Sequence, residues 1–408
     1  MHAGACIGAR AAGFDHLSDD DFARVTIAQA FAHAPRLDPS GTSWLPFPFW
    51  SLGLGMMALG RALATAQALA IALNSVAIVA PYLALREAGI DRARALVGLT
   101  LGFVTPSALF LGAATVPESS TASFVAAGAV LVGLPGVSAR ARLAGGVLVL
   151  AATLSRYEAW PVAAVLGIAA LVEARRDRRA LGAAVLCAAG PLLWMAWNAH
   201  AHDGPLHFFR RVSSFKRAIG EGSTDPVAAL VLFPRLLVTA RPEVTVPALL
   251  LLRRGRRWVV PLLAVAAQVA FLAYGNARDG APAHHPERTL LACFVLLALF
   301  VADVGLAAVA TWRSRTGLAA LACVGLLWAA TTVRDAADIP GRSPGEDRSA
   351  QRERGRALRD LGAEHVTLVP CAFEQFALIA ELEAPERVTT LPRTSAPVTA
   401  GCPSVRIE

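Results

Sequence analysis

Three consecutive aspartates, Asp19, Asp20 and Asp21, stand near the start of the chain in the stretch HLSDDDFARV. Like charges in a row repel each other, so the run needs an explanation. A carboxylate can act as a general base and remove a proton from a reacting group. The simpler alternative is a helix cap with Ser18 as N-cap, because carboxylates in a first helical turn interact favourably with the helix dipole. A cap accounts for two of the three aspartates.

Other ionisable side chains stand at the ends of apolar segments. Arg and Lys bind phosphate, and a carboxylate beside them can act as a general base. Two alternatives stay open: a local ion pair within a turn for Arg156 and Glu158, and a solvated surface for the polar loop at 198–226. The residues are Glu118 in TVPESS, Arg156 and Glu158 in SRYEAW, Arg210 and Lys216 in the polar loop, and His285, Glu287 and Arg288 in HHPER.

The segments that must position these residues have the composition of membrane spans. Of the 408 residues, 55% are hydrophobic and only 17% are charged, whereas soluble domains are about a quarter charged. Several stretches are nearly free of charge and as long as a spanning helix requires. We therefore predict an all-α polytopic membrane protein with about 10 transmembrane helices. The clearest spans are 62–85, 94–112, 158–173, 180–197, 257–275 and 289–310.

Arginines recur in every second loop, at 86–94, 140–142, 175–179, 253–257 and 313–315. The positive-inside rule makes these loops cytoplasmic. They carry no interleaved aromatic residues, which argues against nucleic-acid binding. The remaining loops and the aspartate run then face the exterior, the periplasm if the membrane is a bacterial inner membrane. Because the chain would begin outside, we expect a first transmembrane helix to precede the given start.

Three regions follow from this pattern. Residues 1–50 form an extracytoplasmic segment that ends in TSWLPFPFW, which is either an aromatic membrane anchor or an interfacial helix. Residues 51–333 form the transmembrane bundle. Residues 334–408 form a linker and a small α/β module, in which RALRDLGAEHVTLV predicts a helix and a strand, CAFEQFALIAELEA a helix and ERVTTL a strand. Cys371 and Cys402 of this tail are either a disulfide pair or free thiols, and no Cys/His spacing supports a zinc site.

The stretch HLSDDDFARVTIAQAFAHAP followed by TSWLPFPFW resembles the first external loop of the GT-C superfamily of glycosyltransferases. These are polytopic enzymes that use polyprenyl- or dolichyl-phosphate sugars, of the mannosyltransferase and aminoarabinose-transferase kind. Their loop has an acidic pair, a helix and a Trp-Leu-Pro stretch. SRYEAW and HHPER are similar to helix-end motifs found later in such chains. The resemblance extends over residues 15–300 and is strongest at 16–50.

The resemblance implies a reaction and a role for each polar residue. A lipid-phosphate-linked sugar would enter from the bilayer and a hydroxyl acceptor (on a glycan, lipid or protein) from the water. Asp20 would be the general base of an inverting transfer, with Asp19 and Asp21 as positioning groups or ligands of an optional divalent metal, and no other cofactor is implied. Arg156, Lys216, Arg288 and Arg210 would bind the donor phosphate, and Glu118, Glu158, His285 and Glu287 would orient the substrate.

Two other classes of function compete with this one. A transporter or lipid-linked-sugar flippase would need paired broken helices and charges at mid-membrane depth, and the sequence pattern predicts neither. A structural subunit whose tail binds a partner would not need the external polar residues. The enzyme hypothesis predicts that Asp20, Arg156 and Arg288 share one cavity.

Overall fold

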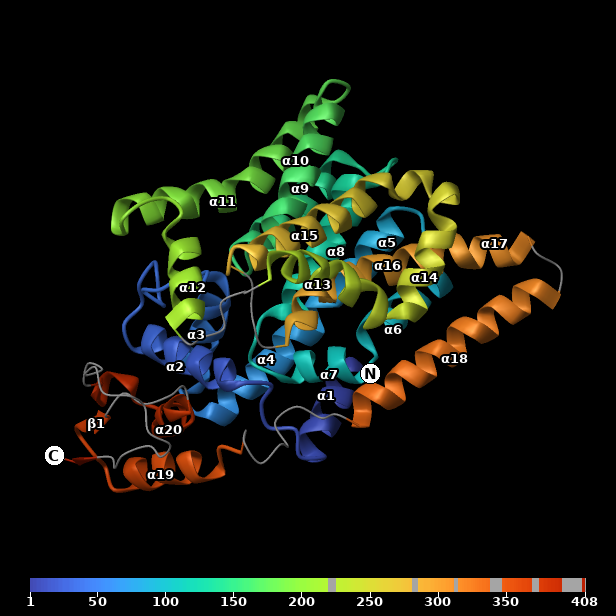
Figure 1. The fold of residues 1–408 in the computed structure, drawn as a ribbon. Helices are drawn as coiled ribbons and strands as arrows, with labels where there is room; N and C mark the ends of the chain where they lie inside the picture. The colour runs from blue at the N-terminus through green and yellow to red at the C-terminus, as the bar shows by residue number, and fades with distance from the viewer. Residues whose placement is uncertain are drawn as a thin grey trace.

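The computed structural model of the chain describes residues 1–218, 225–280, 285–311, 315–337, 347–368, 374–390 and 406–407. Helices make up most of these residues (Figure 1). The helices of the first half are α1 (His2–Ala11), α2 (Asp19–His33), α3 (Phe47–Leu59), α4 (Leu63–Ala77), α5 (Val79–Glu87), α6 (Arg92–Phe103), α7 (Pro106–Ala113), α8 (Glu118–Gly133), α9 (Ala139–Thr153), α10 (Ala159–Ala174) and α11 (Leu181–Ala201).

The second half continues with α12 (His207–Ala218), α13 (Pro226–Thr239), α14 (Pro242–Leu251), α15 (Val259–Ala277), α16 (Leu291–Phe300), α17 (Leu306–Thr311) and α18 (Arg315–Ala337). The tail contains α19 (Ser349–Asp360), α20 (Gln375–Leu382) and the strands β1 (Val366–Leu368), β2 (Val388–Thr390) and β3 (Arg406–Ile407). The strands form one sheet in the order β2-β1-β3, with β2 parallel and β3 antiparallel to β1. The predicted α/β tail is therefore confirmed.

The centre of the bundle is α16, whose ten residues LACFVLLALF are all buried. A helix that is apolar on every side needs neighbours on every side, and α16 packs against α6, α8, α14 and α15. Gly98 and Gly102 of α6 face it, and a Cβ on Gly98 would lie 2.9 Å from Leu299 Cδ2. Small residues thus allow these two helices to approach closely.

Within the part of the chain that the structure describes, four segments are long and apolar enough to cross a membrane: 63–87, 178–201, 256–277 and 286–309. The predicted span 94–112 is instead a broken pair, α6 and α7, bent by 78°. Three further apolar helices, α3, α10 and α13, are shorter than a full span. The all-α polytopic membrane fold is confirmed, but the described residues contain four helices of full span length, or five if the bent pair is one span, instead of the predicted number of about 10.

Two features that the sequence did not predict bear on the transporter alternative. The helices α6/α7 are broken, and α13 and α14 are separate helices on either side of Arg241. Charged residues also lie within the bundle, since Glu243 is 0% and Asp303 is 3% exposed. This fold thus contains broken helices and buried charged side chains, and the contacts of these side chains indicate whether they serve structure or function.

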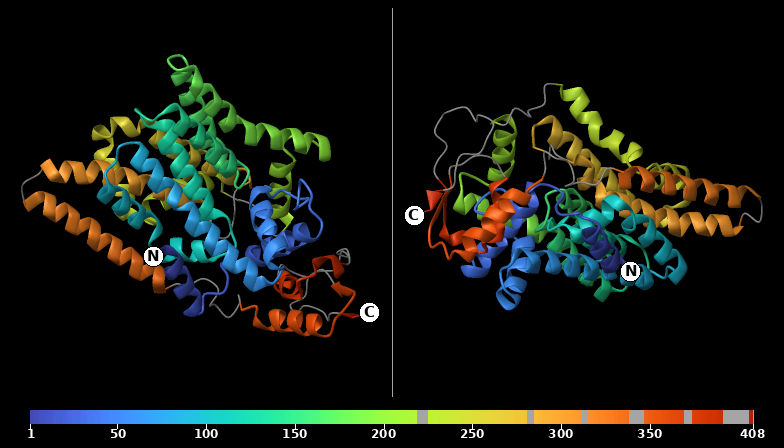
Figure 2. Two further views of the ribbon diagram at one scale, coloured as in Figure 1. Left: turned by 180° about the vertical axis from the view of Figure 1, so that it is seen from behind. Right: turned by 90° about the horizontal axis from the view of Figure 1, so that it is seen from below.

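One end of the molecule carries α2 and α3 together with the tail (Figures 1 and 2). Helix α20 packs on α2, and α3 lies on the same helix. The long helix α18 leaves the bundle as an arm on the other side (Figure 1). The two tail cysteines, Cys371 and Cys402, lie outside the described residues. The candidate site lies where α2 meets the bundle.

Candidate functional site

Asp21 anchors the start of α2. Its side chain and that of Ser18 form a capping box, and its Oδ2 accepts the backbone N–H groups of Leu17 at 3.0 Å and Ser18 at 3.2 Å. Its Oδ1 accepts the backbone N–H of Thr115 at 2.8 Å and the Thr115 hydroxyl at 3.0 Å. Both oxygens are thus occupied by the chain itself, so the cap that the sequence suggested is present.

Asp20 points to a different partner. Arg288 Nη2 lies 2.7 Å from Asp20 Oδ2, and the Asp20 side chain is 30% exposed whereas that of Arg288 is 7% exposed. Burial raises the pKa of the Asp20 carboxyl, but the charges of Arg288 and Arg24 outweigh this and hold the pKa below its usual value. Asp20 is therefore ionised at neutral pH and is reachable from outside the bundle.

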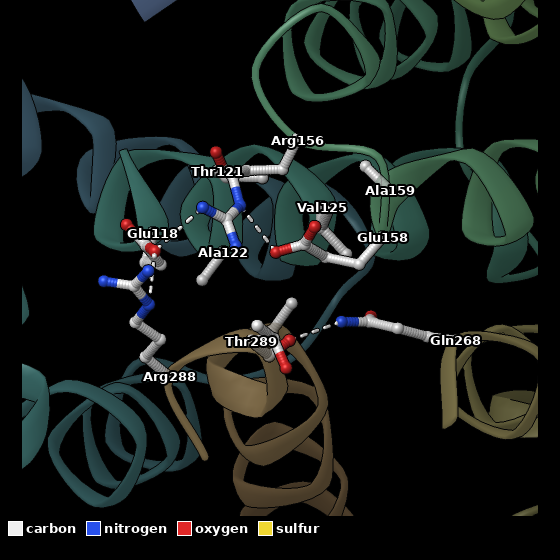
Figure 3. Close-up of a pocket in the computed structure, with 11 residues that line it drawn as sticks. Glu118, Thr121, Ala122, Val125, Arg156, Glu158, Ala159, Gln268, Arg288 and Thr289 are labelled. Carbon is white, nitrogen blue, oxygen red and sulfur yellow. Dashed lines mark hydrogen bonds and ion pairs between the residues drawn. The ribbon is translucent and has the colours of Figure 1, made fainter. Parts of the chain in front are cut away.

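Arg288 connects Asp20 to a second group of charges, shown in Figure 3. Glu118, at the start of α8, has its Oε1 3.4 Å from Arg288 Nε and 2.9 Å from Arg156 Nη1. Arg156, in the turn between α9 and α10, donates from Nε to Glu158 Oε1 at 2.7 Å. Burial lowers the pKa of Arg156, but the carboxylates of Glu118 and Glu158 raise it further, so the guanidinium stays charged. Residues from four parts of the chain thus form one chain of ion pairs.

A small cavity lies behind these ion pairs, between α8, α10, α15 and α16 (Figure 3). Its volume of about 10 Å³ is enough for a single water molecule. Arg156 and Arg288 both line it, as predicted, but Asp20 does not line it and reaches it only through Arg288. Thr121 Oγ1 and Gln268 Oε1 are buried there with no hydrogen-bond partner among the described residues. The cavity is therefore polar as well as enclosed.

Arg24 is the residue of this region that the sequence analysis did not assign. It is 5% exposed and lies on α2 four residues after Asp20. Its guanidinium carbon sits 4.6 Å from the ring centroid of Trp44 and 5.8 Å from that of Phe49. No described residue forms a hydrogen bond or ion pair with it, and its buried Nε has no partner. Burial lowers the pKa of Arg24 to about 10, so the group remains a cation at neutral pH.

Asp19 faces away from this cluster. Its two carboxylate oxygens accept from Arg348, at the start of α19, with Nε–Oδ1 at 2.7 Å and Nη2–Oδ2 at 2.8 Å. The three aspartates therefore have three separate partners: Arg348, Arg288 and Thr115. The described part of the chain contains no group of three or more His, Cys, Asp or Glu that could hold a metal ion. As arranged here, Asp19 and Asp21 do not fit the optional metal-ligand role.

Several predicted residues are not brought to the cluster. Arg210 is exposed and pairs with Asp203, with Nη2–Oδ1 at 3.1 Å. His285 Nδ1 lies 3.6 Å from Glu287 Oε1, and both side chains are partly exposed beside Arg288 without lining the cavity. Lys216 is buried on α12 and does not line the cavity either. Of the four predicted phosphate-binding cations, the structure brings only Arg156 and Arg288 to Asp20.

Arg24 and Arg348 were not predicted as site residues, and only Arg24 could have been found from the sequence. Arg24 stands at the i,i+4 spacing from Asp20, which puts the two on one helix face, so the sequence contained the clue. Arg348 lies 329 positions from its partner Asp19, in what looked like a polar linker. No spacing rule connects residues that far apart.

The bundle with its charge cluster has the GT-C fold, the fold of the superfamily that the sequence resembles. Two solved structures of ArnT from Cupriavidus metallidurans share it. The apo state matches with a TM-score of 0.55 and 14% identity over 92% of this chain and 86% of ArnT. The state bound to undecaprenyl phosphate matches with 0.58 and 15% over 95% of this chain and 88% of ArnT.

The archaeal oligosaccharyltransferase AglB from Archaeoglobus fulgidus, in complex with an inhibitory peptide and a dolichol-phosphate, also matches. Its TM-score is 0.51 and its identity 13%, over 90% of this chain and 60% of AglB. No family model and no curated protein sequence matches the chain. At these identities the comparisons establish the fold of a multi-pass membrane protein, and the chemistry must be argued from the site.

Proposed function

We propose that the protein is a glycosyltransferase that moves a sugar from a polyprenyl-phosphate donor to a hydroxyl acceptor, with inversion. The observation that carries the proposal is the position of Asp20. It is the most exposed of the three aspartates, at 30% against 20% for Asp19 and 4% for Asp21. It also contacts a buried arginine of the ion-pair cluster. The GT-C fold and the ligands named for its structural neighbours, undecaprenyl phosphate and dolichol-phosphate, support this reaction class.

Asp20 acts as the base in this proposal. The acceptor hydroxyl gives its proton to the Asp20 carboxylate while its oxygen bonds to the anomeric carbon. The bond from that carbon to the phosphate oxygen breaks, and the polyprenyl phosphate leaves with the electron pair. Since Arg288 lowers the pKa of Asp20, the carboxylate is ready to accept a proton at neutral pH.

The leaving phosphate needs a cation that is not already neutralised. Arg156 and Arg288 each contact at least one carboxylate. Arg24 has no carboxylate at ion-pair distance among the described residues, and its charge is buried against two aromatic rings. A buried charge without a partner is costly, and a phosphate would supply one. We therefore assign the donor phosphate to Arg24, and the sugar hydroxyls to Glu118 and Glu158.

The proposed location is a bacterial inner membrane with the site facing the exterior. The arginine-rich turns at 86–94, 175–179 and 252–257 favour this orientation through the positive-inside rule. The aspartate run and the tail would then be periplasmic. Fusions of a reporter after residue 177 and within the tail test this: activity of a periplasmic reporter is expected only from the tail.

The test of the activity is transfer of a radiolabelled sugar from a polyprenyl-phosphate donor to membrane acceptors by the purified protein in vesicles. General-base assistance contributes about 10²–10⁴-fold, so Asp20→Asn should lose activity by that factor. Asp360→Asn is the matched control, because Asp360 is an exposed tail aspartate with a side chain 70% exposed. Normal turnover by Asp20→Asn would remove Asp20 from the mechanism.

A lipid-linked-sugar flippase is the second candidate, and the broken helices α6/α7 favour it. Transporters use such breaks to build sites at mid-membrane depth. The two functions give different products in sealed vesicles loaded with a fluorescent polyprenyl-phosphate sugar. A flippase moves the intact donor between leaflets, whereas the transferase releases polyprenyl phosphate and a glycosylated acceptor.

A further inference from the structure

The C-terminal module, here residues 347–368 and 374–390, lies against the helix that carries the aspartate run (Figure 2). We propose that this module is a positioning part of the candidate site: Arg348 holds Asp19 and thereby fixes the helical turn that presents Asp20. The inference rests on the proposed function, because it names what keeps the base of that reaction in place. Arg348 is a positioning residue in this proposal, since it contacts Asp19 and not the reacting groups.

The contact between Arg348 and Asp19 is a two-pronged ion pair. Nε lies 2.7 Å from Oδ1 and Nη2 lies 2.8 Å from Oδ2, and the side chains are only 12% and 20% exposed. The planar fork of an arginine matches a carboxylate in this geometry, so it restrains orientation as well as distance. A lysine could supply the charge but not the two parallel bonds.

The same kind of contact occurs a few residues away. Arg352 Nη1 lies 2.5 Å from Asp15 Oδ1, and its Nε lies 2.8 Å from Glu381 Oε1. Arg352 thus joins the loop before α2 to both α19 and α20. Arg348 and Arg352 are four residues apart in the module. They pair with Asp19 and Asp15, which are also four residues apart.

An apolar contact keeps the module in place along the rest of α2. Phe22, Val25 and Ala28 pack with Ala377 and Ala380 in one buried cluster. Gln29 donates from Nε2 to the Ala380 carbonyl at 2.8 Å. The module is therefore packed along α2, and this packing fixes the positions of Arg348 and Arg352.

The first turn of α2 is consequently held on three sides, with Asp19 bound by the module, Asp20 by Arg288 and Asp21 by Thr115. Helix ends are the parts of a fold that open most easily. Without Arg348, the Asp19 carboxylate would be uncompensated one residue from Asp20 and would compete for Arg288. Both the position and the protonation of Asp20 would then change.

The experiment compares full-length variants in the sugar-transfer assay and in hydrogen–deuterium exchange. Because a small displacement of a catalytic group costs on the order of 10- to 100-fold, Arg348→Gln should lower kcat by that factor with little change in donor KM. The acid limb of its pH–rate profile should move to higher pH, and exchange of the amides of residues 18–24 should rise. Arg348→Lys should recover only part of the activity.

Two controls keep the result interpretable. Arg354→Gln, on the exposed face of the same helix, should behave as the unchanged protein. In an Asp19→Asn background, Arg348→Gln should have no further effect, because the pair is already broken. Equal losses in both backgrounds, or a loss no larger than that of Arg354→Gln, would overturn the inference.

The exchange measurement separates this inference from the proposed function. If the unchanged protein transfers no sugar but Arg348→Gln still loosens residues 18–24, the docking is correct and the reaction is not. If the unchanged protein transfers sugar and Arg348→Gln alters neither kcat nor exchange, the reaction stands and the positioning role is wrong.

Discussion

Two buried arginines, Arg24 and Arg241, have similar exposure and a similar aromatic neighbour but opposite polar surroundings. Arg24 is 5% and Arg241 3% exposed, and each guanidinium carbon lies 5.8 Å from a phenylalanine ring centroid. Arg241 donates from every nitrogen, to the Glu243 carboxylate, to Thr105 Oγ1 at 3.2 Å and to the Leu101 carbonyl at 2.6 Å. Arg24 donates to none of the described residues. The difference separates a charge used to build the fold from one left available to a ligand.

Arg241 explains why the bundle tolerates two broken helices. The last carbonyls of a helix have no partner within it, and Arg241 bonds the carbonyl of Leu101 near the end of α6 from the break between α13 and α14. The Arg334 side chain bonds the carbonyls of Thr239 and Ala240 at the end of α13. Arginine side chains thus satisfy backbone carbonyls at both helix breaks, which gives the breaks a structural explanation besides the one that a flippase would give.

The largest effect is expected at Arg241, the buried arginine whose nitrogens are all hydrogen-bonded within the fold. Arg241→Gln leaves Glu243, which is 0% exposed, as a buried charge without its partner. Breaking a buried pair in this way costs about 3–5 kcal/mol. We expect a large fall in thermal stability of the protein in detergent, measured by loss of monodisperse protein on heating.

The double variant Arg241→Gln with Glu243→Gln serves as its control. It removes both charges, so it should recover much of the stability that Arg241→Gln loses. If the single variant were as stable as the unchanged protein, the contrast with Arg24 would disappear.

The second prediction concerns Arg24 itself. A hydrogen bond to a charged group contributes about 1.5–3 kcal/mol, so Arg24→Gln should lower kcat/KM for the polyprenyl-phosphate donor roughly 10- to 100-fold. Thermal stability should stay the same or rise, because a buried unpaired charge is removed. Arg278→Gln is the matched control: Arg278 is exposed and lies 5.7 Å over the Tyr274 ring. Loss of stability with unchanged kcat/KM would make Arg24 a structural residue like Arg241.

The third prediction compares two aspartates of the run, Asp21, which is bonded within the fold, and Asp20, which is partly exposed. Asp21 accepts hydrogen bonds on both oxygens, whereas Asp20 has an exposed carboxylate. Asp21→Asn replaces one accepting oxygen by a donating amide and should cost about 1–3 kcal/mol of stability. Per folded molecule it should leave far more transferase activity than Asp20→Asn does. Equal activity losses in the two variants, measured on purified folded protein, would contradict the assignment of Asp20 as base.

The sequence predicted apolar spans, the tail and the start of α2 because hydrophobic periodicity and capping residues act locally. It also held a signal for both helix breaks that went unused. Thr105 precedes Pro106 and Arg241 precedes Pro242, and a residue before proline is disfavoured in a helix. Hydropathy averaged over a span does not register such a break, so 94–112 was predicted as one helix.

The candidate site was predictable only in part. Residue type and the predicted membrane side were enough to select Glu118, Arg156, Glu158 and Arg288, and the family resemblance selected Asp20. The structure brings these five residues together. The same reasoning selected Arg210, which is equally basic but is exposed and paired with Asp203. Whether a cation is neutralised depends on partners far away in the sequence, and this is why Arg24 and Arg348 were missed.

The smallest expected effect concerns His16, a buried group whose charge depends on its neighbours. It is 1% exposed, its ring centroid lies 4.9 Å from that of Phe22 with the planes tilted by 49°, and its Nδ1 lies 3.2 Å from Asp15 Oδ2. Burial lowers its pKa, but the hydrogen bond to Asp15 and the charges of Asp21, Asp15 and Asp19 raise it above 6.5. A group with a raised folded pKa contributes stability that is complete below its unfolded pKa and is lost as pH rises through the folded pKa.

Stability should therefore decline modestly as the pH rises above about 6.5, measured by thermal unfolding of the protein in detergent. Asp15 does not add to this slope. Burial raises its pKa, but His16 and Arg352 lower it to about 2, so its contribution is lost only in strong acid. His16→Asn should flatten the decline, whereas His365→Asn, at an exposed tail position, should keep it. A stability that rises with pH over this range would mean that His16 is held neutral by burial, as a structural group, and that the aspartates around it do not govern its charge.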